Sequence, residues 1–129
     1  MAGTDLSTFN PANVQALVQE ITSQISGDAT AWWNANSTLV TGYVKSLSEA
    51  AIQTQLALAE GRIDQPTANQ ILDMQKNAFT QTLQFTQYMT LALAQQIENT
   101  VFTVIGWAIY NKTGFNLFPT LVQPKPAGS

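Results

Sequence analysis

The chain has 129 residues, of which 45% are hydrophobic and only 10% are charged, and its net charge is −3. This length and apolar content suit one domain with a modest core and argue against intrinsic disorder. Because the sequence contains one Arg, no His and no Cys, it offers no basic patch for nucleic acid and no disulfide framework or thiolate site, and it lacks the commonest general base and metal ligand.

The N-terminal part predicts a short amphipathic helix over residues 11–26. Asn10 is placed to cap it, Pro11 suits its first position, and apolar residues follow at helical spacing: Val14, Leu17, Val18, Ile21 and Ile25. Residues 1–10 are polar and lack the basic and apolar regions of a secretory signal, so export by that route is not expected. The sequence does not indicate the cellular compartment of the protein.

A second helix is predicted over residues 29–60, with Gly27 ending the first helix and Asp28 capping the second. Its apolar residues form two adjacent stripes, one through Trp33 and one through Trp32, Leu39, Tyr43 and Ala50. This face is wider than a coiled-coil seam, so the helix is expected to contact more than one neighbour. Trp32 and Trp33 point about 100° apart, which makes both candidate interface aromatics, with ligand stacking as the alternative.

Residues 60–66 predict a tight turn between two helices. Gly61 stops the incoming helix, Asp64 supplies an N-cap oxygen for the outgoing one, and Pro66 is tolerated in the first turn. Such a short link makes the flanking helices antiparallel neighbours.

The segment from 64 to 110 is nearly free of charge and favours one long helix over residues 65–111. Its non-core faces carry amides and hydroxyls, which suit contact with protein better than exposure to water: Gln81, Gln84, Gln87, Thr90, Gln95 and Gln96. At about 1.5 Å per residue this helix would extend roughly 70 Å, against roughly 48 Å for its partner. Its C-terminal part would therefore overhang.

The overhanging apolar side chains need cover, and three arrangements would provide it. The N-terminal helix folds back, or a second copy covers them, or residues 100–106 leave the helix as a strand or bend. We favour a helix covered by a second copy. The predicted self-association residues are Leu93, Ile97, Val101, Phe102, Ile105, Trp107, Phe115 and Phe118.

Lys112 and Gly114 are the expected C-terminal signals of the long helix, and an apolar tail interrupted by prolines follows over residues 112–129. This tail suits docking in a groove. Glu98 lies in the most apolar part of the helix, so we expect an Asn, Gln or Lys partner from a neighbouring chain. The polar residues around Glu98 argue against an ordinary transmembrane helix.

The sequence thus predicts an all-α fold, with a long antiparallel helical hairpin, a short N-terminal helix and an extended apolar C-terminal tail in a single domain over residues 1–129. The remaining acids lie at helix ends or alone on helix faces, so we expect no enzyme activity, cofactor or metal site. The leading hypothesis is a structural protein whose partners are copies of itself in an oligomer, filament, sheet or shell. The alternative is an amphipathic protein that coats or perturbs lipid or another apolar surface. A helical bundle with a small-molecule pocket ranks third.

Overall fold

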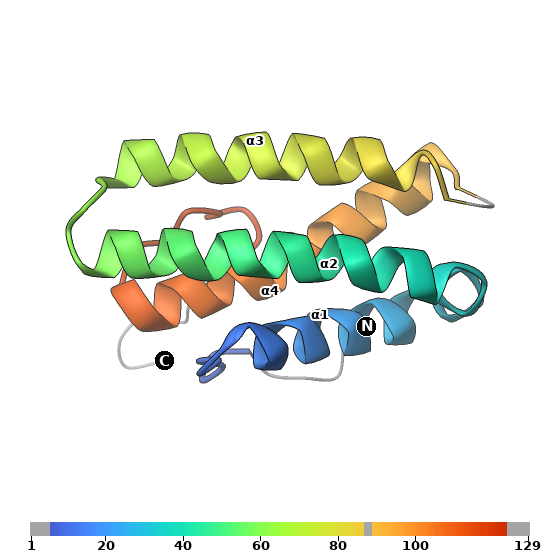
Figure 1. Ribbon diagram of the computed structural model, residues 1–129, viewed down its shortest axis with the longest axis horizontal. Coiled ribbons are helices and arrows are strands. Elements are labelled where there is room, and N and C mark those ends of the chain that lie inside the picture. The colour runs from blue at the N-terminus through green and yellow to red at the C-terminus, as the bar shows by residue number, and fades with distance from the viewer. Residues whose placement is uncertain (1–5, 87–88, 124–129) are drawn as a thin grey trace.

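The computed structural model describes residues 6–86 and 89–123, and this part of the chain forms four helices and no strand (Figure 1). The helices are α1 (Val14–Asp28), α2 (Thr30–Ala59), α3 (Gln65–Leu83) and α4 (Leu91–Thr113). The predicted all-α fold is confirmed. Helix α2 contacts each of the other three helices, as its wide apolar face predicted, and α4 contacts α1 and α3 as well.

The start of α1 and its junction with α2 differ from the prediction. Helix α1 begins at Val14, where the side chain of Asn13, rather than that of Asn10, accepts a 2.9 Å hydrogen bond from the backbone N–H of Ala16. The helix continues through Gly27 to Asp28, so the predicted stop and cap at these two residues are wrong. The Asp28 carboxylate instead accepts a 2.9 Å hydrogen bond from the hydroxyl of Thr100 in α4. This bond joins the α1–α2 junction to α4, 72 residues later in the sequence.

The turn between α2 and α3 has the predicted chemistry. Gly61 adopts a left-handed φ of 74°, and Pro66 lies in the first turn of α3. The side chain of Asp64 caps α3 by accepting a 2.9 Å hydrogen bond from the backbone N–H of Thr67. Hydrogen bonding by Thr67, through its side chain first and then its backbone, holds the pKa of Asp64 below the ordinary value. The carboxylate therefore stays charged at the positive end of the helix dipole.

The prediction of one continuous helix over residues 65–111 is wrong, because α3 ends at Leu83 and α4 begins at Leu91. Polar side chains stabilise both ends of the break. The Thr86 hydroxyl donates to the carbonyl of Leu83 at 2.6 Å and accepts a 3.1 Å hydrogen bond from Trp32 Nε1. Thr90 caps α4 by accepting a 3.1 Å hydrogen bond from the backbone N–H of Leu93.

Helix α4 consequently folds back along the bundle instead of overhanging it (Figure 1). Helix α1 packs against α4, which is the first of the three arrangements considered and not the one favoured. Residues 100–106 remain helical within α4. The predicted exposed residue Gln87 lies outside the described residues.

The C-terminal segment folds back onto α4 of its own chain (Figure 1, red). Gly114, with φ of 81°, ends α4 as expected. Phe118 and Val122 are buried over Gly106, where a Cβ atom would approach Val122 Cγ2 to 2.6 Å. The predicted extended tail is therefore largely docked, and its residues 124–129 lie outside the described part of the chain.

Candidate functional site

Five of the predicted self-association residues lie in the core of the chain itself. Ile97, Val101, Phe102 and Ile105 are at most 1% exposed, and Phe118 is 7% exposed. The prediction is corrected for these five, because it depended on an overhang that does not exist. Helices α1, α2 and α3 and the C-terminal segment cover α4, so these side chains offer no surface to a second copy.

The other predicted interface residues differ in how deeply they are buried. Trp32 is buried and bonded to Thr86, so it belongs to the core, while Trp33 and Leu93 are partly buried against it. Trp107 is also partly buried and forms an edge-to-face contact with Tyr110, with ring centroids 5.9 Å apart. Phe115 is 39% exposed just beyond α4. Self-association therefore stays a prediction chiefly for Trp107 and Phe115.

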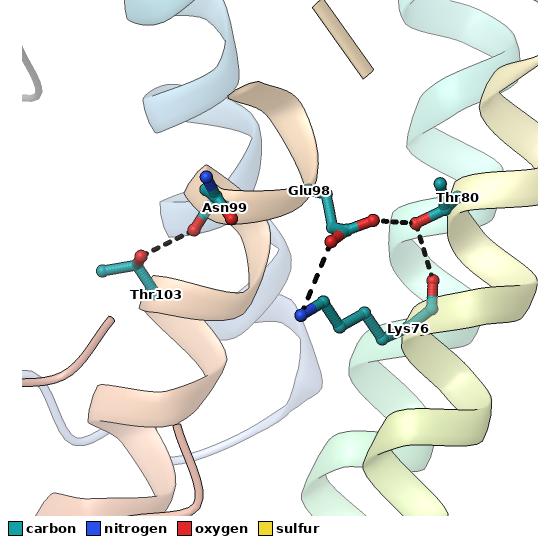
Figure 2. A network of polar contacts seen from close by, with 5 residues as sticks. All are labelled: Lys76, Thr80, Glu98, Asn99 and Thr103. Carbon is teal, nitrogen blue, oxygen red and sulfur yellow. Dashed lines mark hydrogen bonds and ion pairs between the residues drawn. The ribbon is translucent and has the colours of Figure 1, made fainter. Parts of the chain in front are cut away.

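Glu98 finds its partners within the same chain, contrary to the predicted interchain contact. Figure 2 shows its carboxylate between two side chains of α3: Lys76 Nζ lies 3.5 Å from Glu98 Oε1, and the Thr80 hydroxyl donates to Glu98 Oε2. The same hydroxyl lies 2.8 Å from the backbone carbonyl of Lys76. This network joins α3 to α4 and neutralises the carboxylate. It contains no second carboxylate.

Replacing Thr80 with Val is expected to lower the free energy of unfolding by about 1 kcal/mol, because a partly buried carboxylate loses a donor while the side-chain shape is kept. Thr103→Val is the matched control, since its hydroxyl bonds only the carbonyl of Asn99 in its own helix, at 2.6 Å (Figure 2). Denaturant unfolding followed by circular dichroism measures both losses. Equal losses would show that the contact between α3 and α4 contributes nothing beyond the local bond.

A surface that the sequence reasoning did not identify runs along α2 and α3. It comprises two hollows, which we call together the α2–α3 groove. The first, of about 250 Å³, is lined by Tyr43, Ser46, Leu47, Ala50, Gln75, Ala78, Phe79 and Thr82. The second, of about 440 Å³, is lined by residues 34–39 and Phe85. Among residues 6–86 and 89–123, no charged residue lines either hollow.

Helical spacing explains why these residues form one surface. On α2, Leu39, Tyr43 and Ala50 recur at intervals of four and seven, which places them on one face. On α3, Ala78 and Thr82 are followed three residues later by Phe85. The backbone N–H of Phe85 donates to the Thr82 carbonyl at 3.1 Å, so the chain continues its helical course past Leu83. Phe85 therefore stays in line with the groove.

Most of the groove lies in the two longest uncharged stretches of the sequence, the exceptions being Ser46, Leu47, Ala50 and Gln75. No Asp, Glu, Lys or Arg occurs between Asp28 and Lys45, or between Lys76 and Glu98. Helix surfaces that remain in water usually carry charge, whereas the central part of a protein interface is depleted of it. The stripe through Leu39, Tyr43 and Ala50 was visible in the sequence. The face of α3 that lies opposite this stripe was not predicted, because the helix was expected to continue past Phe85.

Large apolar side chains remain exposed around this end of the bundle. Phe85 is 79% exposed and Leu39 is 45% exposed, while Leu91, at the start of α4, is 78% exposed. An exposed apolar patch on a folded domain marks a contact site more often than scattered single residues do. The groove and Phe85 are therefore the candidate functional site.

The comparisons with known proteins found no match, whether to a protein-family model, a curated protein or a solved structure. Within residues 6–86 and 89–123, no helix has the length and apolar character needed to cross a membrane. The same residues contain no group of three or more His, Cys, Asp or Glu placed to hold a metal ion.

Proposed function

We propose that this chain is a non-catalytic structural subunit that associates with copies of itself through the α2–α3 groove and Phe85. The observation that carries the proposal is a phenyl ring 79% exposed beside a groove without a single charged side chain. Leaving such a ring in water forfeits the free energy of burying it, and a contact with protein recovers that free energy.

The chemistry of the groove favours burial against another protein. Because it holds no charged side chain, its burial desolvates no ion and leaves none unpaired. Its polar side chains, such as Ser46, Gln75 and Thr82, are neutral hydrogen-bonding groups that pair with the same kinds of groups on a second copy.

A second exposed aromatic region lies at the opposite end of the bundle. Helix α4 runs from the α3–α4 connection to the other end of the molecule, where Phe115 follows it (Figure 1). Trp107, Tyr110 and Phe115 are each partly exposed there. A subunit with contact surfaces at two separate ends extends its assembly beyond a pair, so we propose an oligomer or filament.

The other two hypotheses have weaker support. A protein that coats lipid benefits from basic residues around its apolar side chains, and no Lys or Arg of the described residues lines either hollow. The first hollow, at about 250 Å³, is smaller than the roughly 300–1,000 Å³ of ordinary small-molecule pockets. The second, at about 440 Å³, reaches that size, but Phe85 and Leu39 in its lining are 79% and 45% exposed, so it does not enclose a ligand.

The size of the assembly is expected to be unchanged, or to increase, on moving from low ionic strength to about 0.5 M salt, because uncharged contacts offer no ion pairs for salt to screen. Sedimentation velocity at several salt concentrations measures this dependence. Dissociation at high salt would mean that charged residues outside the groove control association. Binding of the chain to vesicles in place of self-association would favour the surface-coating alternative.

A further inference from the structure

The α2–α3 groove carries a projecting ring and an empty hollow on the same face of α3. Phe85 projects beyond the end of the helix, while the first hollow lies beside Ala78 and Thr82. Seven residues separate Ala78 from Phe85, which corresponds to about 10 Å along a helix. The chain's own Phe85 borders the second hollow and does not line the first.

We propose that two copies of the chain pair about a two-fold axis, with Phe85 of each copy seated in the first hollow of the other. This inference rests on the proposed function and specifies its contact. A two-fold contact is self-complementary, so a projection and a hollow that lie close together on one face satisfy each other reciprocally. The two α3 helices then run antiparallel, with Gln81, which lies between Ala78 and Phe85, close to the axis.

The hydrogen-bonding groups of the hollow favour protein over lipid as its occupant. The hollow is lined by Ser46, Gln75 and Thr82 beside its apolar side chains. Hydrocarbon chains of a lipid offer such polar groups neither donor nor acceptor, whereas the exposed side-chain amides of Gln81 and Gln84, next to Phe85, offer both.

Charge complementarity also fits a second copy. Neither Phe85 nor any residue that lines the first hollow is charged, so the two surfaces of a pair leave no ion buried without a partner. Charged residues lie next to the lining in sequence, Lys76 after Gln75 on α3 and Lys45 and Glu49 between Tyr43 and Ala50 on α2, but none of the three lines the hollow. The pairing therefore needs no other protein to supply a compensating charge.

Phe85→Ala in the full-length chain is expected to weaken pairing by two to three orders of magnitude. A central aromatic residue of an interface contributes a factor of at least about 30, and a two-fold pair loses two such contacts. Ala78→Trp, which fills the hollow and keeps Phe85, is expected to weaken pairing similarly. Leu56→Ala is the matched control, because Leu56 is an apolar residue 42% exposed on α2 that lines neither hollow of the groove. Its dissociation constant should equal that of the parent chain.

The two-fold symmetry of the pair can be tested separately with single introduced cysteines, because the chain contains no native cysteine. Gln81→Cys is expected to form a disulfide-linked dimer under mild oxidation, whereas Leu56→Cys, which lies outside the groove, should form little. Circular dichroism establishes that each variant is folded, and sedimentation equilibrium gives the dissociation constants.

The outcomes separate this inference from the proposed function. If the parent chain associates and Phe85→Ala and Ala78→Trp associate equally well, the reciprocal contact is wrong and assembly uses another surface. If the parent chain is monomeric, the proposed function fails as well. If Phe85→Ala abolishes binding to phosphatidylcholine vesicles but leaves self-association unchanged, Phe85 contacts lipid and the inference is overturned.

Discussion

Phe102→Ala is expected to lower the free energy of unfolding by about 3–5 kcal/mol, the largest effect of any substitution considered for this chain. Phe102 is 0% exposed, and its ring packs against two other aromatic rings. The ring centroid of Phe79 on α3 lies 6.3 Å away, and that of Phe118 in the C-terminal segment lies 5.6 Å away. Truncation therefore leaves a cavity where three segments of the chain meet.

Such a loss is a large fraction of the roughly 5–15 kcal/mol that stabilises a typical domain. Urea unfolding followed by circular dichroism measures it. Phe115→Ala is the control, because Phe115 is 39% exposed and its truncation should change the free energy of unfolding little. Similar losses for the two variants would contradict the placement of Phe102 at the centre of the core.

Gly106→Val is expected to lower the free energy of unfolding by about 3 kcal/mol, the upper end of the usual cost of overpacking. A Cβ atom at this position would lie 2.6 Å from Val122 Cγ2 and 3.2 Å from Phe118 Cδ2. Val122 is a stiff, β-branched residue, so the contact is relieved only if the C-terminal segment moves away from α4. That movement exposes Phe118 and Val122, which are buried in the native chain.

Gly42→Val is the matched control for this prediction. Gly42 also lies within a helix, and apart from the neighbouring backbone of that helix no atom of the described residues lies within 4 Å of a Cβ placed there. Since Val has a higher helix propensity than Gly, the control should leave stability unchanged or raise it slightly. If Gly106→Val is equally harmless, the C-terminal segment does not pack on α4 as described. Limited proteolysis of the segment reports its release independently of stability.

The parts of the fold that sequence predicted are those determined by neighbouring residues. Gly61 and Asp64 act within a single turn, so the link between α2 and α3 was accessible from residue type and spacing. The break between α3 and α4 has no such local cause, because residues 84–90 contain neither Gly nor Pro. One of its stabilising contacts is the hydrogen bond from Trp32 to Thr86, 54 residues apart in sequence. Helix propensity alone does not predict that contact.

The same break determines how much of the candidate site was predictable. The low charge of residues 64–110 predicted a contact surface, and a continuous helix placed that surface on Ile97, Val101 and Phe102. Once α4 folds back, those side chains form the core, and Phe85 becomes the exposed ring. Asp28 was likewise assigned to a cap because its hydrogen-bond donor, the hydroxyl of Thr100, is 72 residues away in the sequence.

Self-association of the native chain is the central claim, and multi-angle light scattering across a micromolar concentration series tests it most directly. The chain mass is 14.0 kDa, so the groove and the aromatic end predict a weight-average mass of at least twice that value, rising with concentration. A single species of 14.0 kDa at every concentration, unfolding cooperatively, would contradict the claim.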